Sequence, residues 1–161
     1  MSRQDKQKSV LVAQYFLDKS MKSSRHDLTN KKLQKLLFYA QAWSMVVNNK
    51  KLFNDKFEAW IHGAAIPAIY RKYKTFGFNP ISESVDENDF QALTDIEKSL
   101  LDEVWNIYGK YDADYLELLN HSEEPWQNAR KNLSPFESSS SAISESGMKS
   151  YYGKKLQETK A

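Results

Sequence analysis

The chain has 161 residues, 40% of them hydrophobic, with no cysteine and a formal net charge of +2 from 23 basic and 21 acidic side chains. This length suits one compact domain around a single core. The lack of cysteine excludes disulfides, thiolate metal sites and a cysteine nucleophile, and the near-balanced charge argues against nucleic acid as the default partner. No apolar stretch approaches the roughly 18 residues of a membrane span, so we expect a cytoplasmic protein with no membrane contact.

Helical spacing of apolar residues marks the first two elements. Residues 7–21 form an amphipathic pattern that the polar stretch 22–27 interrupts. Thr29 is a plausible N-cap for a second helix that ends near residue 48. Because this helix is apolar on most of its sides, it is predicted to be the central one. Its apolar stripe contains Leu33, Leu36, Leu37, Ala40 and Val47.

A small β element is predicted next in the chain. Residues 57–61 alternate between apolar and polar and indicate a short strand. Residues 78–85 alternate in the same way and are predicted to pair with them as a two-stranded sheet. Between the two, Pro67 suits the first turn of a short helix that ends at Gly77.

Capping signals place the remaining helices. Thr94 and Glu97 form a capping box ahead of a helix that ends before Gly109. Asp112 is the predicted cap of the next helix, and a further short helix runs from Pro125 toward residue 130.

The last helix completes a mainly α fold. Ser144 is its predicted N-cap, with Ile143 and Met148 as a hydrophobic staple, and residues 157–161 are expected to be a frayed tail. The sequence thus predicts a single compact helical domain over residues 1–156, with about six to eight helices and a small two-stranded β element.

The histidines do not indicate a metal site. His26, His62 and His121 lack the close spacing of zinc ligands, so no metal and no cofactor are predicted. His62 or His121 beside a carboxylate would meet the minimum for acid–base chemistry, but a histidine that bonds a backbone carbonyl is the favoured interpretation. No serine-nucleophile motif and no phosphate-binding glycine loop is present. Glu123 and Glu124 are expected to complement the positive end of the helix that follows them.

A basic cluster lies near the start of the second helix. The cluster has the charge needed for phosphate contacts, although a solvated helix end is the favoured interpretation, and it consists of Arg25, His26, Lys31, Lys32 and Lys35. Lys35 differs, because its stem must follow apolar surface and its ammonium group then needs a specific partner.

Four segments in a fixed order resemble the Panacea domain family, also described as SocA-like or GepA-like phage-associated proteins. They are residues 32–41, 59–70, 121–130 and 143–152, within a resemblance that spans about residues 8–156. The family usually has Gly-Pro after its tryptophan, whereas Gly63 is followed here by Ala64. This departure makes a less rigid turn an open alternative.

The resemblance implies an antitoxin without enzymatic activity that neutralises a cognate toxin, encoded nearby, by direct binding. Some relatives are associated with delivering a toxin to an ATP-dependent protease, so an adaptor role is a variant of this function. The alternative is a nucleic-acid-binding regulator of a prophage or operon, and a hydrolase that uses His62 or His121 is third.

We expect the segments of the resemblance to converge on one partner-binding groove, in which buried aromatic anchors and arginine supply binding energy. The residues of this hypothetical groove are Lys35, Trp60, His62, Gly63, Tyr70, His121, Trp126 and Arg130.

Overall fold

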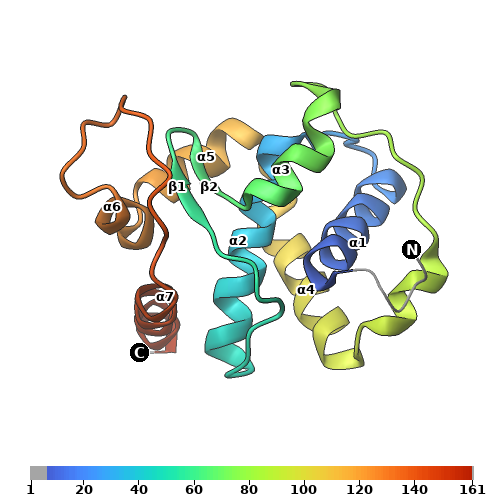
Figure 1. Ribbon diagram of the computed structural model, residues 1–161. Coiled ribbons are helices and arrows are strands. Elements are labelled where there is room, and N and C mark those ends of the chain that lie inside the picture. The colour runs from blue at the N-terminus through green and yellow to red at the C-terminus, as the bar shows by residue number, and fades with distance from the viewer. Residues whose placement is uncertain (1–6, 161) are drawn as a thin grey trace.

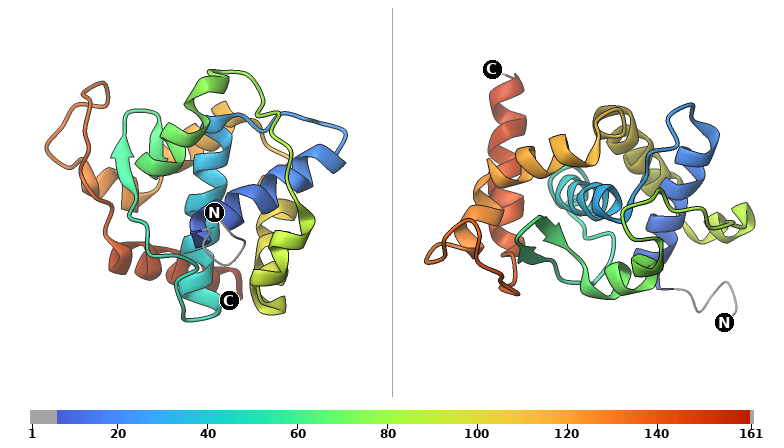
Figure 2. Two further views of the ribbon diagram at one scale, coloured as in Figure 1. Left: turned by 45° about the vertical axis from the view of Figure 1, so that its right-hand side comes forward. Right: turned by 90° about the horizontal axis from the view of Figure 1, so that it is seen from above.

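The longest helix, α2 (Asn30–Val47), lies at the centre of the domain in the computed structural model, which describes residues 7–160. In Figure 1, α1 (Lys8–Lys22) and α4 (Asp95–Tyr108) lie on one side of α2, and the hairpin β1–β2 lies on the other side, with α7 (Glu145–Lys160) below it. Seen from above, α2 is viewed along its axis and is enclosed by the other elements (Figure 2). The predicted single, mainly α domain is therefore confirmed.

Three further helices and two strands complete the regular structure between residues 7 and 160. None of the helices in this range is both long enough and apolar enough to cross a membrane. The strands are β1 (Glu58–Trp60) and β2 (Gly63–Ala65), the helices are α3 (Pro67–Tyr73), α5 (Ala113–His121) and α6 (Glu124–Ala129), and short 3-10 turns occupy η2 (Lys74–Phe76) and η3 (Glu87–Ala92).

The capping predictions are confirmed in detail. The Thr29 hydroxyl accepts from a backbone amide of the first turn of α2, and the Asp112 carboxylate does the same at α5. Thr94 and Glu97 form the complete reciprocal capping box of α4, with bonds of 2.9 and 3.1 Å. Ser144 accepts from the amide of Gly147 at the start of α7. These helix starts follow from local chemistry, because each cap satisfies an amide that its helix leaves unpaired.

Polar side chains of α2 hold the irregular segments around it. The amide group of Gln41 accepts from the backbone N–H of Leu52 at 2.8 Å and donates to the carbonyl of Phe53 at 2.7 Å. Buried backbone groups need such partners, because water cannot reach them. The central helix therefore organises loops as well as the apolar core. Its buried polar and charged residues are Asn30, Lys32, Gln34, Lys35, Gln41 and Ser44.

The two-stranded sheet is present, but its predicted partner strand is wrong. β1 pairs antiparallel with β2 across a tight turn at Ile61 and His62, and residues 78–85 form no strand. Instead, the amide of Ile81 donates to the carbonyl of Leu28 at 2.9 Å. Closing a short local turn costs less chain entropy than pairing strands far apart in the sequence, which favours the local hairpin.

The region around α6 and α7 differs from expectation in two respects. Glu123 is buried and accepts hydrogen bonds from the hydroxyls of Tyr39 at 2.7 Å and Tyr152 at 2.8 Å, so it joins α2 to α7 rather than only complementing a helix end. Burial raises the pKa of Glu123 above its usual range. α7 continues as a helix through residues 157–160, where the sequence predicts a frayed tail.

Candidate functional site: a cavity beside the hairpin

The β2 edge of the hairpin is held by side chains from α2 and α5. The ammonium group of Lys35 donates to the carbonyl of Ala64 at 3.2 Å, and the amide of Ala64 donates to the side-chain oxygen of Asn120 at 2.8 Å. The next free amide, that of Ile66, donates to the side-chain oxygen of Gln34 at 2.8 Å. This edge is therefore fully bonded within the domain and cannot accept another strand.

The β1 edge is closed in a similar way by the C-terminal part of the chain. The amide of Ala59 donates to the carbonyl of Ser141 at 2.8 Å, and the guanidinium of Arg130 donates to the carbonyl of Ala59 at 2.9 Å. The indole N–H of Trp126 donates to the carbonyl of Trp60 at 2.8 Å. With bonds along both edges, the hairpin has a fixed position on the domain.

Gly63 is required at the turn because it allows Lys35 to pass close beneath it. Its φ of +107° disfavours any L side chain, and a Cβ there would lie 2.3 Å from Cε of Lys35. The neighbouring Ala64, which stands where the family resemblance leads one to expect a proline, donates its backbone N–H to Asn120. A proline has no N–H to make this bond. The turn in this chain is thus fixed by hydrogen bonds rather than by a proline ring.

A cavity of about 190 Å³ lies where the hairpin turn faces α2, α3 and the turn at Gly77. The rings of Trp60 and Tyr70 meet edge to face there, with centroids 5.0 Å apart, and Phe78 is 99% exposed. None of the lining residues is acidic. The lining consists of Asn30, Lys31, Gln34, Lys35, Trp60, Ile61, His62, Gly63, Ala65, Tyr70, Lys74, Gly77 and Phe78.

Five of the eight residues predicted for the groove line this cavity, and three do not. His121 stacks on Trp126 with ring centroids 4.0 Å apart, and the guanidinium carbon of Arg130 lies 4.9 Å from the centroid of the same indole. Trp126 and Arg130 are buried, and both donate to backbone carbonyls at the β1 edge. His121, Trp126 and Arg130 therefore lie on the β1 side of the hairpin, outside the cavity. The residues of the predicted groove that line the cavity are Lys35, Trp60, His62, Gly63 and Tyr70.

Lys35 is the most unusual charged group of the site. Its side chain is fully enclosed, and the loss of hydration lowers its pKa to about 7. Nearby Glu117 opposes this shift, while the positive charge of Lys31 adds to it. The carbonyl of Ala64 takes one of the three ammonium protons. A lysine that changes charge near neutral pH is well suited to respond to a ligand.

His62 does touch a carboxylate, which is the contact that a hydrolase would need. Its Nδ1 lies 3.3 Å from a carboxylate oxygen of Glu117, and its side chain is 70% exposed. Burial alone would raise the pKa of Glu117, but bonds from Lys31 and His62 hold it below the usual range. No serine or threonine lines the cavity, so no hydroxyl nucleophile lies beside this contact. Residues 7–160 also contain no cluster of three side chains suited to a metal ion.

Three cations of the basic cluster are neutralised within the fold. Lys32 is buried, and its ammonium contacts Asp27 at 2.8 Å and the carbonyl of Gly109 at 2.6 Å, so the expected solvated helix end is wrong for this residue. Arg25 also pairs with Asp27, at 3.0 Å, and Lys31 pairs with two carboxylates of α5. Paired cations of this kind offer little to a phosphate backbone.

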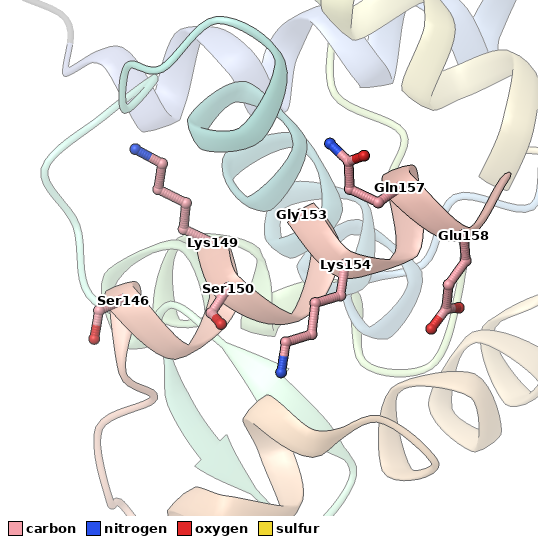
Figure 3. A pocket seen from close by; sticks show the side chains of 7 residues that line it. All are labelled: Ser146, Lys149, Ser150, Gly153, Lys154, Gln157 and Glu158. Carbon is pink, nitrogen blue, oxygen red and sulfur yellow. The ribbon is translucent and has the colours of Figure 1, made fainter. Parts of the chain in front are cut away.

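A larger depression lies on the outward face of α7 (Figure 3). It has a volume of about 760 Å³, but all seven lining residues belong to this one helix. Ser146, Ser150 and Lys154 point to one side of the helix, and Lys149 points to the other. Because no second element closes it, this depression is a helix surface rather than an enclosed site.

The family model described as the SocA-like antitoxin, Panacea domain, matches residues 33–127, which is more than half of the chain. The chain belongs to this family. The matched range contains most of α2, the hairpin and almost all of the residues that line the cavity. No curated protein and no solved structure matches the chain.

Sequence reasoning missed several residues of this Panacea domain site. Gln34 lies within the run that carries the resemblance, so its position between Lys31 and Lys35 was a usable signal. Phe78 falls within residues 78–85, whose alternation predicts a strand, and this interpretation gave no indication that Phe78 is exposed beside the turn at Gly77. Asn120 gave no signal, because its role depends on the contact between α5 and β2.

Proposed function

We propose that this Panacea domain is an antitoxin that neutralises its toxin by direct binding and without catalysing a reaction. Membership of the family indicates an antitoxin-like domain. The observation that carries the proposal further is the cavity beside the hairpin, which is lined by Trp60, Tyr70 and the fully exposed Phe78 together with three lysines and a histidine. Partner-binding surfaces are enriched in such large aromatic side chains.

The rigidity of the hairpin supports a binding role. Its backbone groups are bonded along both edges, and Gly63 and Lys35 are tightly packed against each other. A surface that is already ordered loses little conformational entropy when a partner binds. Most of the free energy gained when the partner buries the aromatic side chains then contributes to the affinity.

The toxin class is open, and the reading frame next to the gene is the natural candidate. The test is to express this neighbour from an inducible promoter, alone and together with the domain, and to follow growth. We expect the neighbour to arrest growth alone and the domain to restore it. A neighbour that is harmless alone, or that stays toxic when both are expressed, contradicts the proposal.

Two exposed phenylalanines provide a matched pair of variants for the same assay. Phe78 lines the cavity, whereas Phe136, which is 87% exposed, lies in the loop before α7. Neither substitution by alanine removes core packing, so both variants are expected to fold. We expect Phe78→Ala to lose protection and Phe136→Ala to protect like the wild type. Equal protection by both variants contradicts a role for the cavity.

The level of toxin in protected cells separates inhibition by binding from delivery to a protease. We propose inhibition by binding, so the toxin level is expected to stay constant after protein synthesis is stopped. Rapid loss of the toxin that depends on the domain and on an ATP-dependent protease indicates the adaptor role instead.

A further inference from the structure

Two lysines at the wall of the cavity beside the hairpin, Lys35 and Lys74, have no carboxylate partner among the residues that the structure describes. Lys31, Lys35, Lys74 and His62 line the cavity together with aromatic rings and neutral amides, and no carboxylate does. Lys31 is already paired with Asp114 and Glu117, and His62 contacts Glu117, so a negatively charged ligand would be bound mainly by Lys35 and Lys74. The ammonium group of Lys35 is buried, and a single carbonyl accepts from it. This wall is therefore complementary to a negatively charged group.

The size of the cavity indicates what kind of molecule carries that charge. Small-molecule sites usually have volumes of roughly 300–1,000 Å³. The volume here is about 190 Å³, less than such sites require. This is room for one side chain or one chain end. A protein segment that inserts one group fits better than a free cofactor.

We propose that the cavity receives a carboxylate that is adjacent to a large apolar side chain on the toxin. Lys35 donates hydrogen bonds to the carboxylate, and the apolar side chain packs against Trp60 and Phe78 at the rim. The proposal rests on the proposed function, because the toxin supplies the segment.

The charges around Lys35 make this binding dependent on pH. The groups that face it are Glu117 and His121 on α5, Lys31 on α2, and His62 in the hairpin turn. With a pKa of about 7, Lys35 is only partly protonated in the free domain at neutral pH. A bound carboxylate favours the ammonium form, so binding takes up a proton. If only the protonated form binds, the affinity falls about thirtyfold between pH 6 and pH 8.5.

The first test uses the wild-type domain alone with N-acetyl-leucine and its uncharged analogue N-acetyl-leucinamide as probes. The protein is labelled with 15N and with 13C in its lysines, so that NMR spectra report the backbone amides and, directly, the titration of Lys35. We expect N-acetyl-leucine to shift the amide signals of Gly63 and Ala64 and to raise the titration midpoint of Lys35, whereas the leucinamide does neither. An equal response to both probes, or no response to N-acetyl-leucine, overturns the proposal.

The second test measures the affinity for the toxin across this pH range. We expect Lys35→Met to weaken binding at pH 6 at least tenfold and to remove most of the pH dependence. His62→Gln is expected to keep the part of the pH dependence that is due to Lys35, and the exposed Lys154→Met on α7 is the matched control.

If Lys35→Met binds as tightly as the wild type, the inference is overturned while the antitoxin function stands. If the wild-type domain does not bind the toxin at all, the proposed function fails, and the N-acetyl-leucine titration still decides the chemistry of the cavity.

Discussion

Gly63 and Lys35 depend on each other for their positions. The lysine stem crosses beneath the turn where any Cβ would meet it, and its ammonium group bonds the carbonyl of the next residue. The pair explains why a glycine with positive φ follows a buried lysine by 28 positions in this fold. Burial of the Lys35 amine costs free energy, so this residue does not serve the stability of the domain alone.

We predict that Gly63→Ala lowers the free energy of unfolding by about 2–4 kcal/mol, through backbone strain and overpacking against Lys35. Urea denaturation followed by circular dichroism measures this. The control is Gly153→Ala in α7, where an added Cβ meets no atom within 4 Å. This control is expected to stabilise the domain by about 0.5–1 kcal/mol, because alanine favours helix. A neutral Gly63→Ala contradicts the close approach.

Lys35 also predicts a specific dependence of stability on pH. Its pKa is about 7 in the folded domain and 10.5 when exposed, so the unfolded chain holds more protons between these values. Stability therefore rises with pH in this window, by up to about 1.4 kcal/mol per pH unit from this group. We expect the difference in unfolding free energy between the wild type and Lys35→Met to change with this slope from pH 7 to pH 10. A constant difference contradicts a neutral amine in the folded state.

At the scale of elements, local signals were predictable and long-range ones were not. The caps Thr29, Thr94, Asp112 and Ser144 bond within three residues of themselves, so the sequence reveals them. The partner of β1 was mistaken because alternation in residues 78–85 resembles a strand equally well. The local hairpin closes a shorter loop than a pairing of β1 with residues 78–85 would, and alternation does not report this difference.

Glu123 joins three helices, since it lies at the start of α6 and accepts from tyrosines of α2 and α7. We predict that Glu123→Ala destabilises the domain by about 2–4 kcal/mol, because it leaves two buried hydroxyls without an acceptor. Glu123→Gln keeps an acceptor oxygen and is expected to cost less than about 1 kcal/mol. Thermal unfolding of both variants checks this. Equal losses would show that the charge, rather than the acceptor, matters.

At the scale of the whole molecule, most charges of the basic cluster serve the fold. Arg25 and Lys32 share Asp27, and Lys31 reaches α5, so these cations are not available as a row for phosphates. We predict no specific binding to the DNA upstream of the gene in a gel-shift assay at moderate salt. Tight binding that weakens steeply as salt rises would contradict this and would favour the regulator.

The candidate site was predictable only in part. The order of the segments identified Lys35, Trp60, His62, Gly63 and Tyr70, which share the cavity. The resemblance also led to the prediction of His121, Trp126 and Arg130, which lie outside the cavity. A shared sequence pattern does not distinguish side chains that bind a partner from side chains that support the fold. Only the structure shows that Trp126 and Arg130 donate to the backbone of β1 from behind.

The central claim is that a toxin binds at the cavity beside the hairpin. Hydrogen–deuterium exchange of the domain with and without its toxin tests this most directly, because it maps the bound surface on the wild-type protein. We predict that the toxin slows exchange in the segments that frame the cavity, namely residues 60–64 and 70–78. Protection confined to α4 or to the outward face of α7, with exchange around the hairpin unchanged, would contradict the claim.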